Sequence, residues 1–259
     1  MKPRKTSLSL LLIGLLASGH SHAASLTLDF ESATGTSAPT GWATIGATDN
    51  GSYATTDTDG VGGSNGGSLD WTGPNSVAPT VYLVNSGAAF DATKSISGTF
   101  DFYVVEDGNY SAANFLVGDV QNGLTKTSGG DFLNVFLREK TFGARAALYD
   151  GANTSLVNDA SNDREIFTNQ WNTATFTWTP TSGTTGNFTF SWVRPTNITE
   201  PGLSIPDYTF DSANVYFGFG TGQSPVRFDN ISITGTAIPE PRAALLGGLG
   251  LLALLRRRR

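Results

Sequence analysis

The chain lacks cysteine, its single methionine is Met1, and both of its histidines, His20 and His22, lie near the amino terminus. Residues 24 to 238 therefore contain none of these three residue types. Their absence excludes disulfide bonds, Ser-His-Asp and Cys-His catalysis, and the usual ligand sets for zinc and copper. A stretch of about 215 residues is long enough to bury a hydrophobic core, so stability has to come from packing.

Basic residues are scarce in this middle stretch. The full sequence has 16 Lys and Arg against 22 Asp and Glu, a net charge of −6. Eight of the basic residues and one of the acidic residues lie outside residues 24 to 238, which leaves this stretch with a net charge of −13. Such a surface repels nucleic acids and other polyanions unless cations bridge them, so we expect no nucleic-acid partner. It suits divalent cations, neutral sugars or simple solubility.

Residues 1–23 have the parts of a secretory signal peptide. Three basic residues among the first five precede an apolar stretch, residues 8–17, that is too short for a stable membrane span. Small residues stand before the expected cleavage point, so cleavage is predicted before Ala24. An uncleaved anchor is the alternative.

The carboxyl-terminal segment, residues 237–259, has three parts. Proline cannot sit inside a helix, so the prolines at its start mark the end of the fold. The apolar run that follows has 13 residues and would reach roughly 20 Å as a helix, short for a bilayer. Terminal arginines favour a cytoplasmic carboxyl terminus, so a retained single-span anchor is one interpretation. The three parts are Pro239-Glu240-Pro241, the run 243–255, and Arg256, Arg257, Arg258 and Arg259.

These three parts, in this order, resemble the PEP-CTERM sorting signal of bacterial exported proteins. The resemblance covers residues 238 to 259 and implies a partner, a membrane protease of the exosortase type that cuts near Pro239-Glu240-Pro241. It also implies that the short helix contacts the membrane only transiently. The protein would then be released or transferred to the cell envelope or the extracellular polysaccharide matrix.

Between the two terminal signals, short alternating segments are broken by Gly, Ser, Thr, Asn and Asp, which is typical of strands and turns. The alternation is clearest in residues 95–105 and 171–178, where large apolar side chains fall on one face and Ser, Thr and Asp on the other. Residues 171–178 and 187–193 are predicted to form a hairpin through a multi-residue turn at 180–186. Weaker strand patterns cover 26–30, 131–137, 144–149, 214–220 and 226–235.

About a dozen strands in a stretch of this length predict an all-β fold, a single two-sheet, jelly-roll-like β-sandwich. Its predicted bounds are residues 24–236, with a signal helix before it and a short apolar helix after it. The polar stretches 48–67 and 152–164 are predicted to be surface loops. Residues 26–31 and 228–233 resemble the outer strands of concanavalin-like and carbohydrate-binding jelly rolls, which implies a sugar-binding fold.

Asp29 and Glu31 are two residues apart and therefore share one face of the first predicted strand. If the first and last strands are neighbours, Asp229 approaches them. Three carboxylates with backbone carbonyls would suit structural calcium, which takes six to eight oxygen ligands. The alternative is a solvated strand face. The segment 57–60, Asp-Thr-Asp-Gly, resembles half a calcium loop, although these residues also favour a plain turn.

Aromatic side chains are the candidates for stacking on sugar rings. Trp178 and Trp192 fall within strand patterns beside other aromatics, so we expect them in the core. Trp42 and Trp71 lie in Gly-rich contexts and are the predicted ligand-binding residues. The remaining candidates are Trp171, Tyr82, Tyr103 and Tyr110.

Two observations favour a protein that is not an enzyme. Residue types that catalysis commonly uses are missing, and the sequence has no strand with the alternating Glu-x-Asp-x-Glu pattern of the retaining jelly-roll glucanases. We expect an exported envelope or matrix protein that passes through an inner-membrane intermediate and associates with extracellular polysaccharide. Two alternatives stay open. One is a glycoside hydrolase whose paired carboxylates come from separate strands, and the other is a purely structural surface protein.

Overall fold

The computed structural model describes only part of the chain. Neither the predicted signal peptide before residue 22 nor the predicted sorting motif, Pro239, Glu240 and Pro241 with Arg256 to Arg259, belongs to that part. Among the described residues, no helix is long and apolar enough to cross a membrane. The described residues are 22–28, 30, 38–45, 51–56, 61, 66–71, 82–87, 89–105, 112–119, 132–138, 145–149, 155–159, 168–193, 202–221 and 226–238.

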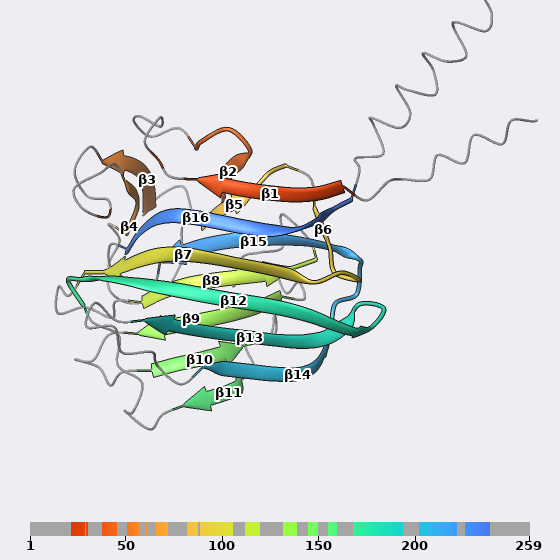
Figure 1. The fold of residues 1–259 in the computed structure, drawn as a ribbon. Helices are drawn as coiled ribbons and strands as arrows, with labels where there is room; N and C mark the ends of the chain where they lie inside the picture. Colours follow the sequence, from red (N-terminus) through yellow and green to blue (C-terminus); the bar gives the residue numbers. More distant parts are fainter. Residues whose placement is uncertain are drawn as a thin grey trace, which may run out of the picture. The chain divides into compact units, whose positions relative to one another are not determined.

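The described residues form sixteen β-strands (Figure 1). The first eight are β1 (His22–Leu28), β2 (Trp42–Ile45), β3 (Gly51–Thr56), β4 (Gly66–Trp71), β5 (Tyr82–Asn85), β6 (Phe90–Asp91), β7 (Ile96–Val104) and β8 (Ala112–Gly118). The others are β9 (Phe132–Arg138), β10 (Arg145–Tyr149), β11 (Ser155–Asp159), β12 (Trp171–Ser182), β13 (Thr185–Val193), β14 (Leu203–Thr209), β15 (Asn214–Thr221) and β16 (Val226–Ala237).

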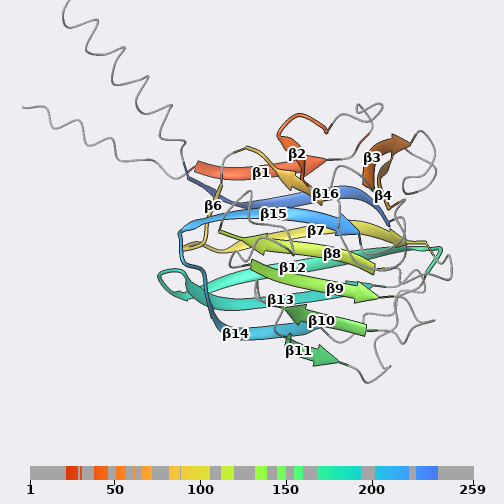
Figure 2. The same cartoon turned by 180° about the vertical axis from the view of Figure 1, so that it is seen from behind.

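These strands form two layers, and every pair of named strands is antiparallel. Sheet A has the order β14-β13-β12-β7-β16, with β1 and β4 pairing along the other edge of β16 and β3 pairing with β4. Sheet B has the order β11-β10-β9-β8-β15-β5-β2. The short strand β6 pairs with both β15 and β16 and so joins the layers. Sheet A faces the viewer in Figure 1 and sheet B in Figure 2, and the predicted all-β sandwich is confirmed.

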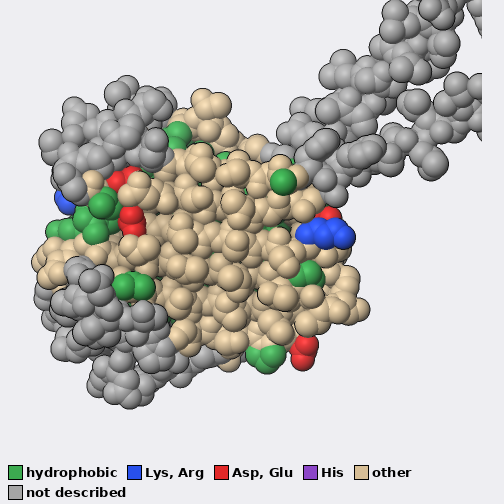
Figure 3. Space-filling model, in the orientation of Figure 1, with side chains coloured by type: hydrophobic (Ala, Val, Ile, Leu, Met, Phe, Trp, Pro, Cys, Tyr) green, Lys and Arg blue, Asp and Glu red, His purple; other side chains and the backbone are tan. Residues whose placement is uncertain are grey.

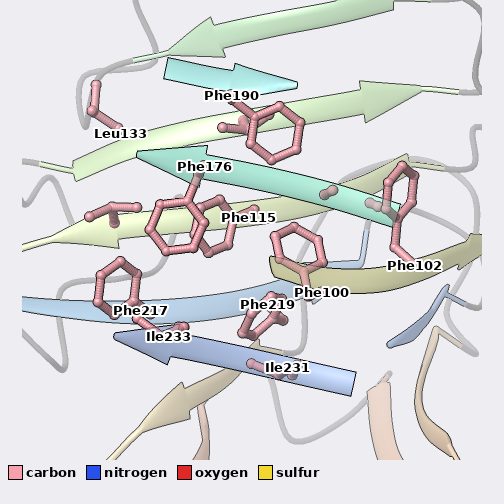
Figure 4. Packing of buried hydrophobic residues seen from close by; sticks show 14 of the residues in the cluster. Phe100, Phe102, Phe115, Leu133, Phe176, Phe190, Phe217, Phe219, Ile231 and Ile233 are labelled. Carbon is pink, nitrogen blue, oxygen red and sulfur yellow. The ribbon is translucent and has the colours of Figure 1, made fainter. Parts of the chain in front are cut away.

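Aromatic rings from both sheets fill the space between them (Figure 4). Phe115 of β8 lies 4.9 Å from Phe100 of β7 and 4.7 Å from Phe176 of β12, between ring centroids. The predicted core positions of Trp178 and Trp192 are confirmed, because both are fully buried. The indole N–H of Trp178 donates to the carbonyl oxygen of Ala92 at 2.7 Å, which satisfies the one polar group of that ring.

The predicted hairpin of residues 171–193 is confirmed, but its predicted multi-residue turn is wrong. Strands β12 and β13 continue to Ser182 and Thr185, which pair directly, so the turn has only two central residues. Gly183 takes a positive φ of 57° there, as tight hairpin turns require. Pro180 fits within β12 because β7 pairs only as far as Trp178, so the missing proline N–H is not needed by that neighbour.

Other predicted bounds were also wrong. The stretches 48–67 and 152–164 contain β3, the start of β4, and β11, because pairing with a neighbour can form a strand from Gly, Ser and Asn, residues of low β-propensity. The first strand is β1, His22–Leu28, rather than 26–30, and Phe30 has a positive φ of 61°. The predicted cleavage point before Ala24 therefore lies inside β1.

Gly98 of β7 is buried on the inner face of sheet A, close to the neighbouring strands β12 and β16 of the same sheet. A Cβ atom at this position would lie 2.5 Å from the Phe176 ring and 2.8 Å from the carbonyl oxygen of Ser232. We expect Gly98→Ala to lower the free energy of unfolding by about 1–3 kcal/mol through overpacking. Gly87→Ala is the matched control, because a Cβ there meets no atom within 4 Å. Denaturant unfolding should separate the two variants, and equal stabilities would contradict this packing.

Candidate functional site

The two predicted ligand-binding tryptophans do not form an exposed pair. Trp42 begins β2 rather than lying in a loop, and it is buried against Phe219, with ring centroids 5.8 Å apart. Its predicted exposure is therefore wrong, because the ring is part of the core. Trp71 ends β4 rather than lying in a loop, and its side chain is outside the described residues.

Of the three predicted calcium ligands, the structure describes only Asp229. The expected pairing of the first and last strands is confirmed, since Leu28 of β1 lies opposite Ile231 of β16. Asp29 and Glu31 lie outside the described residues. Among the residues that are described, no group of three or more His, Cys, Asp and Glu side chains could hold a metal ion.

The carboxylate of Asp229 is buried and accepts hydrogen bonds from the backbone. Its Oδ2 atom accepts from the N–H of Val61 at 2.8 Å, and its Oδ1 atom accepts from the N–H of Asn230 at 2.8 Å. The first bond joins segments 168 residues apart in sequence. Asp229 thus connects the chain at residue 61 to the end of sheet A where Arg227 of β16 lies.

Three half-buried side chains form a row across the outer face of sheet A, which we call the aromatic row: Arg227 of β16, Tyr103 of β7 and Trp171 of β12. Strand register places Tyr103 directly opposite both of the others. The Arg227 guanidinium carbon lies 5.0 Å from the Tyr103 ring centroid, a cation–π distance. The rings of Tyr103 and Trp171 meet edge to face, with centroids 5.5 Å apart and an interplanar angle of 62°.

Hydrogen-bonding groups lie beside the aromatic row, at the neighbouring outward-facing positions of the same strands. Asp101 is two residues before Tyr103 on the outer face of β7, and its Oδ1 atom accepts from the Thr173 hydroxyl at 2.5 Å. The other oxygen, Oδ2, accepts from the Asn230 side-chain amide at 2.9 Å. We call Asp101, Thr173 and Asn230 the polar row. Asp101 is half-buried, and the other two side chains are exposed.

A β-bulge brings Asn230 into this position. The register between β16 and β7 shifts between Asp229 and Ser232, and Asn230 has a positive φ of 49°. Bulges re-aim side chains, and Asn tolerates the left-handed region better than most residues. The Asp229 carboxylate accepts from the Asn230 backbone N–H, so it holds the bulge from which the Asn230 amide reaches Asp101. Asp229 is therefore a positioning residue for the polar row.

Trp171 is also held by its own segment. The N–H of Asn169 donates to the carbonyl oxygen of Val104 at 2.9 Å, and Thr168 forms a parallel bridge with Val104. Asn169 has a positive φ of 58°, which turns the chain into β12. These contacts fix the start of β12 beside the end of β7, so that Trp171 meets Tyr103.

The rest of the outer face of sheet A is mostly hydroxyl-bearing. Cross-strand hydroxyl pairs join Thr177 to Thr189 at 2.6 Å and Ser97 to Thr234 at 3.1 Å. Figure 3 shows the middle of this face largely in the colour of uncharged polar side chains and backbone, with hydrophobic, basic and acidic side chains near its left and right edges. The aromatic row therefore interrupts a mostly uncharged polar surface, and such a break in an exposed sheet face is a candidate binding site.

The face of sheet B opposite the core has a different character. Val84, Leu116 and Phe132 form a small buried cluster there, apart from the main core. Beside them, the side-chain amide of Asn134 donates to Oδ1 of Asn114 at 3.1 Å. Within the part of the chain that the structure describes, Oδ1 of Asn134 is buried without a hydrogen-bond partner. Both amides are about 4% exposed, so we do not place a polymer site here.

Asp119, directly after β8, has a carboxyl group whose pKa is shifted by its surroundings. Burial and, second, the negative charge of Asp211 raise the pKa of the Asp119 carboxyl above its ordinary value. Backbone hydrogen bonds, including those of Asp211 and Ser212, act in the opposite direction. These contacts make Asp119 an anchor for the turn between β14 and β15.

This pKa shift predicts a pH dependence of stability. A raised pKa in the folded state means that Asp119 favours folding below its ordinary pKa, and that this contribution is lost as the pH rises through the folded value. We expect Asp119→Asn to raise the melting temperature at pH 7 by roughly 2–4 °C, with a smaller difference at pH 4. Scanning calorimetry at both pH values would test this, and an Asp119→Asn protein less stable at pH 7 would contradict it.

The residues of the aromatic row were not the predicted pair, but the sequence carried a signal for them. Alternate residues of a strand lie on the same face. Tyr103 alternates with Ser97, Thr99 and Asp101, and Trp171 alternates with the threonines of β12, so the sequence places both rings on the polar face. The register that brings them together comes only from the structure.

No protein-family model and no curated protein matches the sequence. Several solved structures share the fold. Lectin I-B4 from Griffonia simplicifolia matches with a TM-score of 0.56 at 14% identity over 82% of this chain and 99% of the lectin. Lectin II from Ulex europaeus matches with a TM-score of 0.55 at 11% identity over 83% of this chain and 98% of the lectin.

An enzyme also shares the fold. The endo-β-1,4-glucuronan lyase of Trichoderma reesei matches with a TM-score of 0.52 at 13% identity over 80% of this chain and 96% of the lyase. At these identities the likeness establishes a lectin-like β-sandwich fold and nothing finer, because one fold hosts many functions.

Proposed function

We propose that this protein is an exported, non-catalytic β-sandwich that binds extracellular polysaccharide through the aromatic and polar rows. The observation that carries the proposal is the constellation itself. Two aromatic rings, a guanidinium, a carboxylate and an amide meet at one end of an exposed sheet face that otherwise carries mostly hydroxyl groups. The lectin-like fold supports the proposal.

The chemistry of the two rows suits a sugar. A half-buried indole offers a flat apolar surface for the apolar face of a pyranose ring. The carboxylate of Asp101 accepts one hydrogen bond at each oxygen from the protein and has lone pairs left for sugar hydroxyls. The edge-to-face contact and the strand register hold these groups in place before a ligand arrives, which lowers the entropic cost of binding.

Binding can be tested by affinity electrophoresis of the processed protein in gels containing neutral and acidic polysaccharides, including that of the producing cells. We expect retardation in at least one gel, lost in a Tyr103→Ala, Trp171→Ala double variant. Thr179→Ala is the matched control, because Thr179 is exposed on β12 at the opposite end of the same strand. Equal retardation of the double variant and the control would remove the aromatic row from the proposal.

We also propose that residues 237–259 are a sorting signal cut by an exosortase-type protease at the inner membrane. The order of the motif, the apolar run and the arginines supports this proposal. The aromatic row begins β16 at Arg227, whereas the motif follows the last residues of that strand. At about 3.3 Å per residue, Arg227 lies roughly 30 Å from the last residue of β16, Ala237.

Mass spectrometry of the carboxyl-terminal peptide from the producing cells tests the sorting proposal. Cleavage before aspartate yields a peptide that begins at Asp229. A peptide ending between Pro239 and Arg242 would support processing. A peptide ending at Arg259 would identify the tail as a retained anchor.

Structural calcium at Asp29, Glu31 and Asp229 is a further proposal, supported by the pairing of β1 with β16. An ion that binds only the folded state stabilises it by mass action. The melting temperature should therefore be higher in calcium than in chelator. No shift at saturating calcium would remove the site.

Two alternative functions are distinguishable by experiment. A glycoside hydrolase or a lyase would release reducing ends or unsaturated products from a polysaccharide. The observation that favours this alternative is the fold shared with a lyase. A purely structural surface protein would self-associate without binding sugar. Product formation that is lost in a carboxylate variant would replace the non-catalytic proposal.

A further inference from the structure

We infer that the aromatic and polar rows select uncharged sugars over sugars that carry a carboxylate, and that Asp101 is the residue that discriminates between them. This inference rests on the proposed function and names the class of ligand for the same site. The inference follows from the sign of the charge that lies nearest to Trp171, the ring on which a sugar can stack.

Trp171 is the larger ring of the aromatic row, and of the two charged residues in the aromatic and polar rows, the acidic Asp101 is nearer to it in strand register. Tyr103 lies directly opposite Trp171, and Asp101 lies directly opposite Thr173, two residues further along β12. Asp101 is therefore a diagonal cross-strand neighbour of Trp171, at about 7–8 Å between backbone positions, within reach of a sugar stacked on the indole. Both of its oxygens face donors from neighbouring strands, which hold the carboxylate at this position.

The positive charge of the aromatic row lies further from Trp171. Arg227 is on β16, and β7 separates that strand from β12. Two strand spacings amount to about 10 Å. The guanidinium carbon lies 5.0 Å from the Tyr103 ring centroid, a contact that holds this charge against Tyr103. By backbone position, Asp101 is therefore the nearer of the two charges to a sugar on Trp171.

The charge of the whole domain acts in the same direction. With a net charge of −13 over residues 24 to 238, the domain lowers the local concentration of polyanions around it. A sugar hydroxyl can donate to Asp101, whereas a sugar carboxylate at the same position brings two like charges together and cannot donate. Discrimination thus combines attraction for one ligand with repulsion of the other.

Matched polysaccharides provide the test. Neutral glucan, mannan and galactan are each compared with a form whose C6 hydroxyl is oxidised to a carboxylate, so that the backbone is the same within each pair. Dissociation constants are measured at low and high salt with the processed protein. We expect the neutral member of the bound pair to bind at least about tenfold more tightly at low salt, with a smaller ratio at high salt because salt screens the repulsion.

Asp101→Asn separates charge from shape. The asparagine keeps an oxygen that accepts hydrogen bonds but removes the negative charge. The ratio of the affinity for the neutral polysaccharide to the affinity for its oxidised form should therefore fall towards one. Thr179→Ala should leave the ratio unchanged. Tighter binding of an oxidised form, lost in Arg227→Gln, would overturn the inference while leaving the proposed function intact. Binding of neither form of any backbone would overturn both.

Discussion

Phe115→Ala is expected to lower the free energy of unfolding by about 3–5 kcal/mol, more than any other single change considered for this protein. Phe115 belongs to sheet B, but its ring meets rings of both sheets. Its centroid lies 4.7 Å from that of Phe176 and 4.9 Å from that of Phe100 in sheet A. Within sheet B its ring lies nearly parallel to that of Phe217 at 6.1 Å. Truncation would therefore leave a cavity at the centre of the sandwich.

Urea unfolding of the purified protein measures this effect. Phe115→Leu should cost less, because most of the apolar volume stays. Leu156→Ala is the control for loss of an apolar side chain without a cavity, because Leu156 is 40% exposed on the edge strand β11. It should change stability by less than about 0.5 kcal/mol. A Phe115→Ala protein within about 1 kcal/mol of the wild type would show that the two sheets do not pack through this ring.

Trp171→Ala is expected to weaken binding of the recognised polysaccharide by about 30-fold or more, while the melting temperature changes little. Aromatic side chains dominate the energetics of most binding sites, and loss of one such residue typically costs at least about 2 kcal/mol of binding free energy. Trp171 is half-buried at the end of a strand and lies outside the main core, so its removal leaves no internal cavity.

Graded replacements distinguish stacking from simple cross-strand packing. Trp171→Phe keeps a smaller ring and should retain part of the affinity. Tyr103→Phe keeps the ring contacts with Trp171 and Arg227 and should bind nearly as well as the wild type. Titration calorimetry with a defined oligosaccharide measures each step. Affinity unchanged in Trp171→Ala, with a lowered melting temperature, would assign the ring to sheet stability alone.

The sequence predicted the fold class because alternation of apolar and polar residues is a local signal. Residues 95–105 and 171–193 show this alternation strongly, and they form β7, β12 and β13. Strands β3 and β11 were missed because they contain Gly, Ser, Thr and Asn, and they form by pairing with β4 and β10. Pairing with another strand is not visible in the residue preferences of the segment itself.

The site was harder to predict than the fold for the same reason. The Gly-rich context of Trp42 predicts an exposed side chain, yet Trp42 begins a strand whose neighbour β5 brings it into the core. In sequence, Arg227 is 124 residues from Tyr103 and Trp171 is 68 residues from it, and only the register of three strands makes them a row. The bulge that directs Asn230 to Asp101 likewise has no sequence signal beyond an Asp-Asn pair.

Hydroxyl-radical footprinting of the processed protein, with and without its polysaccharide, tests the central claim most directly. Aromatic side chains are labelled when solvent reaches them, so Tyr103 and Trp171 should be labelled in the free protein, whereas buried Trp178 and Trp192 should not. With saturating polysaccharide, labelling of Tyr103 and Trp171 should fall. Unchanged labelling of both residues, under conditions where binding is demonstrated, would contradict the assignment of the aromatic row as the binding site.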